Sequence, residues 1–171
     1  MYKLFEHKHR FSAWAASRAA SVIGCRFSVE VGQEILKTIK DAPLPNNQNK
    51  FNEFHLIQRN TIISKAKSLE LNFTHGVAAK LLNCYYKSMY VNDESIDLKI
   101  RNIIHPPIDS LLLESLYKNE VGGVKEKWKK AKNTRWSKFS NIDYQEVIDE
   151  IIKIYSKEGL WKVEEYWSGY Q

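Results

Sequence analysis

The sequence predicts an all-α fold, a compact domain of several helices. Apolar residues recur at helical spacing through most of the chain, and the alternating patterns typical of strands are short wherever they occur. Only 7 glycines and 4 prolines interrupt 171 residues, which is few for a protein rich in linkers or turns. A chain of this length can bury a substantial core, so we expect one helical domain over residues 1–171.

The first half of the chain shows clear helix boundaries. Alanine and serine dominate residues 11–23, which predicts a helix that another helix can approach closely. Ser28 is placed to cap a second helix over 29–40, because its hydroxyl can accept a bond from a first-turn amide. Proline and asparagine make 41–50 the clearest loop, and a third helix is expected over 51–69.

The second half is read in the same way, from apolar periodicity, caps and breakers. In order, we expect a helix over 76–91, a short helix or loop over 92–106, a helix from its cap Asp109 to Lys118, a break at Gly122-Gly123, a helix over 142–157 that Gly159 ends, and a last turn or two in the aromatic C-terminal segment.

Composition excludes several classes of protein. No run of apolar residues is long enough to cross a membrane, and the N-terminal MYKLFEHKHR is too charged for a signal peptide. Two cysteines, Cys25 and Cys84, are too few for a disulfide scaffold, and neither has a close cysteine or histidine that would complete a metal site. We therefore expect a cytoplasmic protein, associated with the nucleoid if bacterial, that holds no metal and makes no membrane contact.

A net charge of +6 and a pI near 9.2 favour a polyanionic partner. The charge is concentrated in residues 125–138, where seven lysines and arginines accompany a single glutamate and two tryptophans. This segment is the candidate DNA interface, since lysines bind phosphates and an aromatic ring can stack on an exposed base. The alternative is a solvated amphipathic helix that its tryptophans anchor to the core. The residues assigned to DNA contact are Trp128, Lys129, Lys130, Arg135 and Trp136.

Lys80 and Asp109 are the candidate catalytic residues. A lysine amine can act as a nucleophile, and a nearby carboxylate can stabilise a developing cation, which together would permit attack on a sugar carbon with loss of its base. Periodicity places Lys80 on the polar side of its helix near the apolar boundary, where a solvated lysine is equally well explained. Asp109 follows two prolines and precedes an apolar run, which is also typical of a simple helix cap.

The order of residues in HGVAAKLLNC, followed by proline, an apolar residue and aspartate in PPID, resembles the helix-hairpin-helix DNA glycosylases, and the 8-oxoguanine branch most closely. The resemblance covers about forty residues and implies that Gly76 is a hairpin glycine, Lys80 the nucleophile and Asp109 the carboxylate. The chain departs from the family pattern in having one hairpin glycine where two are usual, Thr74-His75 where leucine-proline is usual, and a longer interval between the lysine and the aspartate.

The resemblance implies a specific chemistry on DNA. A nucleotide is flipped out of the duplex, Asp109 stabilises the sugar cation, and Lys80 forms a Schiff base that allows strand cleavage by β-elimination, with no cofactor. Lys87 and His105 are expected near the substrate, although His105 is as well explained by a bond near the prolines. The candidates for an aromatic platform under the flipped base are Trp14, Phe73, Trp136 and Trp161.

Two other functions remain open at this point. The chain could be a noncatalytic nucleic-acid-binding module in which Lys80 is one more phosphate contact. It could also be an interaction protein whose basic face is incidental. The oligomeric state and the base recognised are not encoded in any pattern that we can identify.

Overall fold

The computed structural model describes residues 2–169, and this part of the chain is helical almost throughout, with no strand and one isolated bridge between Val22 and Cys25. The prediction of an all-α chain is therefore confirmed. No helix within the described residues is both long and apolar enough to cross a membrane. The elements are α1 (Leu4–Ala20), α2 (Val29–Lys37), α3 (Gln48–Ser68), α4 (His75–Tyr86), the π-helix η1 (Lys87–Val91), α5 (Leu98–Ile103), α6 (Ser110–Lys118), η2 (Val121–Gly123), α7 (Lys125–Thr134), η3 (Trp136–Lys138), α8 (Asn141–Tyr155) and η4 (Leu160–Tyr166).

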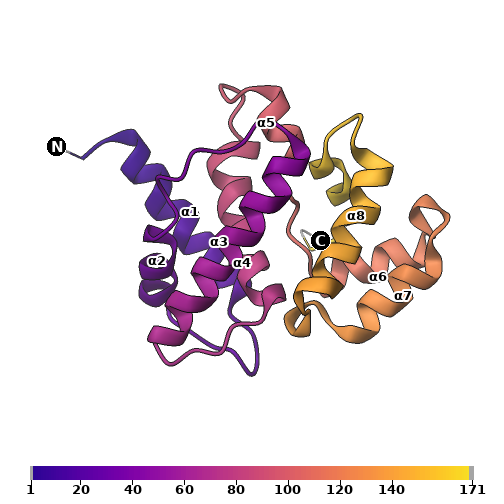
Figure 1. The fold of residues 1–171 in the computed structure, drawn as a ribbon, viewed down its shortest axis with the longest axis horizontal. Coiled ribbons are helices and arrows are strands. Elements are labelled where there is room, and N and C mark those ends of the chain that lie inside the picture. The colour runs from indigo at the N-terminus through magenta and orange to yellow at the C-terminus, as the bar shows by residue number, and fades with distance from the viewer. Residues whose placement is uncertain (1, 170–171) are drawn as a thin grey trace.

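Two hydrophobic clusters form the interior. The N-terminal core joins α1 to α5, and the C-terminal core joins α6, α7, α8 and η4. Figure 1 shows the two groups of helices side by side, with α1 to α4 in indigo to magenta and α6 to α8 in orange to yellow. Helix α4 contributes Val77 and Leu81 to the first core and Ala79 to the second. It therefore belongs to both cores.

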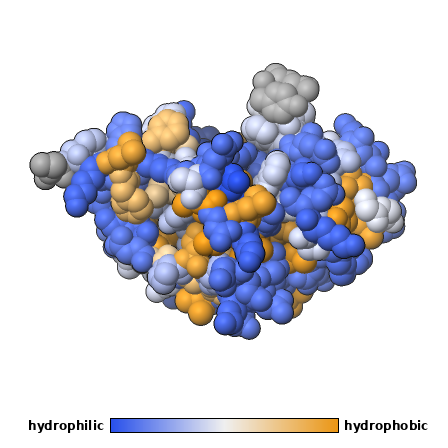
Figure 2. Space-filling model, turned by 90° about the horizontal axis from the view of Figure 1, so that it is seen from above, coloured by the Kyte–Doolittle hydropathy of each residue, from blue (hydrophilic) through white to orange (hydrophobic). Residues whose placement is uncertain are grey.

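Small residues explain how closely α1 packs along α4. Ala13, Ala16 and Ala20 of α1 have no exposed surface and belong to the N-terminal core. The prediction that the alanine-rich segment is a packed helix is confirmed, although the helix begins earlier, at Leu4. On the outer surface, hydrophilic side chains cover most of the face in Figure 2, and apolar side chains gather in patches between them.

Polar caps set the helix boundaries, as the sequence predicts. The Ser28 hydroxyl accepts a hydrogen bond from the amide of Val31, and the Asp109 carboxylate accepts one from the amide of Leu112 at 2.9 Å. The third helix begins at Gln48 and not at residue 51, because Asn47 caps it. The other helices with a side-chain cap start after Thr74, Asp97 and Ser140.

Two apolar residues lie on the surface of their helices. Ile57 of α3 and Ile142 of α8 are exposed, although helical periodicity groups each with the apolar residues of its helix. Ile142 lies in the first turn of α8, and Ile57 faces outward beside Asn60 and Thr61. Neighbouring helices cover only part of each surface, so the apolar stripe of a helix is wider than the face that is buried.

Helix α4 is buried on nearly all sides. Almost every side chain from Gly76 to Tyr86 is buried, including Lys80, for which the sequence pattern indicated a position near solvent. A helix that is surrounded by others has no solvated face, so its polar side chains point into the protein. The helix then continues as the π-helix η1, a distortion that is frequent at functional sites.

Candidate active site

Lys80 and Asp109 meet in the interior. The Lys80 Nζ lies 2.9 Å from Asp109 Oδ2, and the two side chains are only 7% and 17% exposed. The extended segment before α6 brings Asp109 against α4, and the amide of Asn83 fixes this segment by donating to the Pro106 carbonyl at 2.9 Å. The two residues that the sequence singled out are therefore an ion pair.

The Asp109 carboxylate is fixed by three donors. Its Oδ1 accepts from the amide of Leu112 at 2.9 Å, while Oδ2 accepts from Lys80 and from the indole Nε1 of Trp167 at 3.0 Å. Asp109 is thus a helix cap and an ion-pair partner at once. Three donors in different directions hold its plane, so it presents a defined face to any group that enters the site.

A second ion pair lies beside the first. Lys87 of η1 pairs with Glu164 of η4. The Lys87 Nζ also lies 5.8 Å from the centroid of the Trp167 ring, and the Lys80 Nζ lies 5.8 Å from the centroid of Trp136. Each ammonium group therefore has a carboxylate partner and an indole neighbour, which together compensate the charge of the buried Lys80 and of the partly exposed Lys87.

These groups line one cavity, which we call the Lys80 pocket. Its volume is about 310 Å³, within the range typical of small-ligand sites. Small residues of α1 form one wall, which leaves room beside Lys80. The lining residues are Phe11, Ala15, Ala19, Lys80, Cys84, Lys87, Ser88, Asn92, Pro107, Asp109, Glu164 and Trp167.

Burial changes the proton affinity of two groups in the Lys80 pocket. It raises the pKa of the Glu164 carboxyl, and the pairing with Lys87 opposes this effect only in part. Burial also raises the pKa of the Cys84 thiol, an effect that the nearby Lys80 charge reduces. Cys84 is therefore a neutral thiol at neutral pH, and it contributes a polarizable wall and no charge.

Gly76 has a different role from the one expected. The resemblance placed it in the hairpin turn, whereas the turn covers residues 69–74 and Gly76 lies in the first turn of α4. A Cβ at this position would lie 1.7 Å from the Trp136 carbonyl oxygen, and the Gly76 amide donates to the Phe139 carbonyl at 3.2 Å. Glycine is needed here because η3 packs directly on the start of α4, which also places the Trp136 ring near Lys80.

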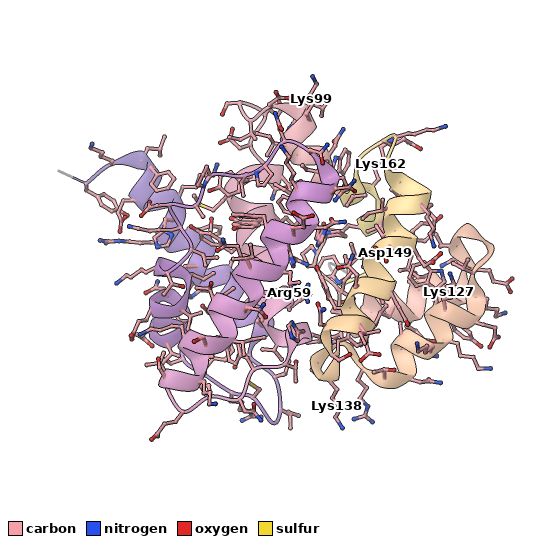
Figure 3. All side chains as sticks on the ribbon, viewed as in Figure 1. Arg59, Lys99, Lys127, Lys138, Asp149 and Lys162 are labelled. Carbon is pink, nitrogen blue, oxygen red and sulfur yellow. The ribbon has the colours of Figure 1, made fainter. Side chains whose placement is uncertain are left out.

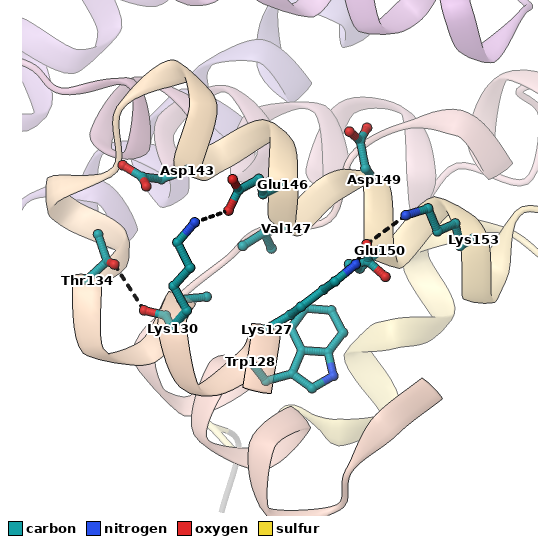
Figure 4. Close-up of a pocket in the computed structure, with 11 residues that line it drawn as sticks. Lys127, Trp128, Lys130, Thr134, Asp143, Glu146, Val147, Asp149, Glu150 and Lys153 are labelled. Atoms are coloured by element: carbon teal, nitrogen blue, oxygen red, sulfur yellow. Dashed lines mark hydrogen bonds and ion pairs between the residues drawn. The ribbon is translucent and has the colours of Figure 1, made fainter. Parts of the chain in front are cut away.

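The basic segment is largely neutralised by neighbouring acids. Five lysines of α7 pair with glutamates, three of which lie on α6 and α8. Lys129 and Lys130, both predicted to contact DNA, are exposed and pair with Glu126 and Glu146. The groove between α7 and α8 in Figure 4 is lined by more acidic than basic side chains. Its ionised residues are Lys127, Lys130, Lys153, Asp143, Glu146, Asp149 and Glu150.

The prediction that Trp128 contacts DNA is wrong. Trp128 is 1% exposed, lies in the C-terminal core and donates its indole N–H to the Val121 carbonyl at 2.8 Å. The alternative, in which this tryptophan anchors a solvated helix, is the one the structure shows. Figure 4 shows its ring beneath the paired lysines.

Arg135 and Lys138 differ from the lysines of α7. Within the described residues, neither has an acidic partner. Arg135 joins α7 to η3 with a φ of 69°, a backbone conformation that is strained for a residue with a side chain. Both residues belong to the segment that packs on the start of α4, and Figure 3 shows Lys138 projecting outward at the lower edge of the molecule.

His105 is buried in a polar cluster and cannot contact a substrate directly, which corrects the prediction. It is 1% exposed; its Nδ1 bonds to the Tyr144 hydroxyl at 3.0 Å and its Nε2 to Asn52 Oδ1 at 2.9 Å. Its partners are side chains, so the alternative of a backbone bond near the prolines is not observed either. Burial, together with the nearby charge of Arg59, lowers the pKa of His105 to about 3.

Arg59 is the centre of the same cluster and has no exposed surface. Its guanidinium donates to His55 Nδ1 at 3.1 Å and to Asn141 Oδ1 at 3.1 Å, bonds to His75 Nδ1, and lies 4.4 Å from the centroid of Tyr144. In Figure 3, Arg59 lies on α3, and its partner Asn141 begins α8 in the other group of helices. The cluster therefore links the two cores. Because Arg59 donates to His55 Nδ1, the His55 proton is on Nε2.

Among the four candidate aromatic platforms, Trp136 contacts Lys80, whose Nζ lies 5.8 Å from the centroid of its ring. Trp14 is half-exposed on α1, with its ring 5.9 Å from that of Phe11 in the pocket wall. Phe73 is buried in the N-terminal core, and Trp161 bonds to Asn102 away from the pocket. Among the described residues, no group of three or more potential ligands is placed to hold a metal ion.

Sequence reasoning missed three residues of the site: Phe11, Glu164 and Trp167. For the C-terminal segment, the sequence predicts only a last turn or two. No local pattern marks them, because their neighbours in space are far away in the sequence. Trp167 and Asp109, for example, are 58 residues apart.

Comparisons of the chain with protein-family models, curated proteins and solved structures find no match.

Proposed function

We propose that this chain is a DNA glycosylase, with associated lyase activity, that uses Lys80 as its nucleophile and Asp109 as its electrostatic partner. The observation that carries the proposal is the ion pair between these two residues in the wall of a 310 Å³ pocket. A buried lysine that faces a cavity together with a carboxylate has the groups that substitution at a sugar carbon requires.

The reaction would break the C1′–N bond of a flipped nucleotide, leaving the electron pair on the departing base. The base then needs a proton, and the ammonium of Lys80 must lose one before its nitrogen can attack C1′. The proton that Lys80 loses passes to the departing base, while Asp109, whose Oδ2 lies 2.9 Å from Nζ, stays ionised and stabilises the sugar cation. The C1′–O4′ bond then breaks as a proton from the attached nitrogen passes to O4′, which gives the Schiff base. Loss of a proton from C2′ to solvent then expels the 3′ phosphate and breaks the 3′ C–O bond of the DNA.

The walls of the pocket support this assignment. Phe11, Pro107 and Cys84 are apolar or weakly polar, while the two ion pairs supply hydrogen-bonding groups. An aromatic or apolar wall with a few directed polar groups is what a flipped base requires. We infer that α3, the turn 69–74 and α4 form the helix-hairpin-helix-like unit of the fold, with a hairpin that differs from the family pattern.

Borohydride trapping tests the proposal. The protein is incubated with duplexes that contain 8-oxoguanine, an abasic site or no lesion, and a covalent protein–DNA band is expected with at least one modified duplex. Lys80→Gln should abolish this band and leave duplex affinity within a few fold, since the side chain is too buried to bind backbone phosphates. An unchanged band in Lys80→Gln would exclude the mechanism.

Matched variants separate chemistry from folding. Asp109→Asn keeps a good capping side chain and removes the charge, whereas Asp97→Asn makes the same change at the cap of α5. Only the first should slow base release. Lys65→Gln removes a different paired lysine, one that forms an ion pair with Glu34. This variant should give the same covalent band as the unaltered protein. Duplex binding without a band in the unaltered protein would favour the noncatalytic nucleic-acid-binding module.

A further inference from the structure

We propose that Trp167 is a positioning residue for Asp109. Its indole holds the Asp109 carboxylate in place after Lys80 has moved away from that carboxylate. This inference rests on the proposed function. Its basis is the geometry of Asp109 Oδ2, which accepts one bond from the Lys80 ammonium at 2.9 Å and one from the Trp167 indole at 3.0 Å.

The two donors to Oδ2 differ in what happens to them during the reaction. Lys80 must lose a proton and turn to C1′, so its charge-assisted bond to Asp109 is lost as the sugar cation develops. The indole of Trp167 is neutral, has one N–H and cannot transfer it at ordinary pH. Its bond therefore persists, and it keeps the carboxylate ionised and oriented when the carboxylate is needed most.

The surroundings of Trp167 make it a rigid donor. It directly follows η4, which the buried side chains of Leu160 and Val163 fix in the C-terminal core. Within η4, Glu164 pairs with Lys87, whose ammonium lies over the Trp167 ring. A donor that is fixed in advance costs little reorganisation during the reaction, which is the property required of a positioning residue.

Trp167→Phe tests this inference, because phenylalanine keeps an aromatic ring and removes the N–H. Trp161→Phe is the matched control: Trp161 belongs to the same segment and donates its indole N–H to Asn102 at 3.1 Å, outside the pocket. We expect Trp167→Phe to lower the single-turnover rate of base release about ten-fold, since a hydrogen bond to a charged group is lost. Duplex affinity should stay within two-fold, and Trp161→Phe should retain the full rate.

A further measurement excludes a merely structural effect. Carbon-detected NMR of the Asp109 carboxyl in the free protein at pH 7 should show a changed chemical shift in Trp167→Phe and an unchanged one in Trp161→Phe, because only the first variant loses a donor to this carboxylate. Thermal unfolding establishes that both variants are folded.

The outcomes separate this inference from the proposed function. If the unaltered protein traps DNA and Trp167→Phe releases the base at the same rate, the positioning role is wrong and the glycosylase proposal stands. If the unaltered protein traps no DNA, the proposed function fails, and the NMR signal of the Asp109 carboxyl decides the role of Trp167. An unchanged Asp109 carboxyl signal in Trp167→Phe would overturn the inference in either case.

Discussion

At the scale of single residues, glycine is required at position 76, but for a different reason from the one that the sequence motif suggested. The sequence suggested a glycine required by a turn, but the residue is helical, and it is the Trp136 carbonyl that leaves no room for a Cβ. The contact holds η3 against α4, and with it the Trp136 ring beside Lys80. A local pattern identifies the glycine, whereas the reason for it comes from a segment sixty residues later in the chain.

Gly76→Ala should therefore destabilise the protein by several kcal/mol, since a new Cβ 1.7 Å from a backbone oxygen forces the two elements apart. Urea unfolding measures the change in the free energy of unfolding. Gly123→Ala is the control: its Cβ would meet no atom within 4 Å, and its φ of 70° should cost only about 1 kcal/mol. Equal losses in the two variants would show that the close packing of η3 is not the cause.

At the scale of elements, α7 and η3 divide the basic segment into two parts. Lysines of α7 lie within reach of glutamates on α6 and α8, while Arg135 and Lys138 have no acidic partner among the described residues. A paired lysine releases fewer counterions when it binds a phosphate, because it must give up an existing partner. Arg135 and Lys138 flank Trp136 in the sequence, and the centroid of the Trp136 ring lies 5.8 Å from the Lys80 Nζ.

We expect Arg135→Glu with Lys138→Glu to weaken duplex binding strongly and to reduce the slope of log affinity against log salt by about two. Lys129→Glu with Lys130→Glu should have a smaller effect, since both lysines are paired. Fluorescence anisotropy over a series of salt concentrations compares the two variants. A larger effect at Lys129 and Lys130 would mean that α7, and not η3, is the DNA-binding element.

At the scale of the whole molecule, the buried polar cluster joins the two groups of helices. His55 and Arg59 belong to α3, Tyr144 to α8, and His105 to the segment that leads to Asp109. Burial lowers the pKa of His55 well below its ordinary value, and the neighbouring charge of Arg59 acts in the same direction. His55 and His105 are therefore neutral in the folded protein at pH values where an unfolded chain is protonated.

The sign of the pH dependence follows from this difference. A histidine with a lowered pKa contributes full stability above pH 6.5, and its contribution falls as the pH drops through the unfolded value. At pH 5 the loss is about 2 kcal/mol for each buried histidine. The raised pKa of Glu164 opposes this loss in part. Urea unfolding should therefore show a midpoint concentration that falls as the pH is lowered from 7 to 5, a range in which most carboxylates remain ionised.

The free energy of unfolding should fall less steeply with decreasing pH in His105→Gln, by the amount that the uptake of about one proton contributes. Substitution of the exposed His7 by glutamine should leave the slope of free energy against pH unchanged. Arg59, Tyr144 and Asn52 face the histidine from the helices around it, so glutamine retains polar partners there. A slope that is the same in His105→Gln and in the unaltered protein would show that other groups control the acid sensitivity.

The sequence by itself determined the all-α class, most helix boundaries, and the choice of Lys80 and Asp109 as a pair worth testing. These follow from short-range physics: apolar periodicity, caps such as Ser28 and Asp109, and breakers such as Gly159. Only the tertiary structure decided which surfaces are buried and which charges meet. Burial of Lys80, pairing of the α7 lysines, and the placement of Glu164 and Trp167 in the pocket all depend on contacts between distant segments. Helical periodicity describes one helix at a time, and it holds no information about what packs against that helix.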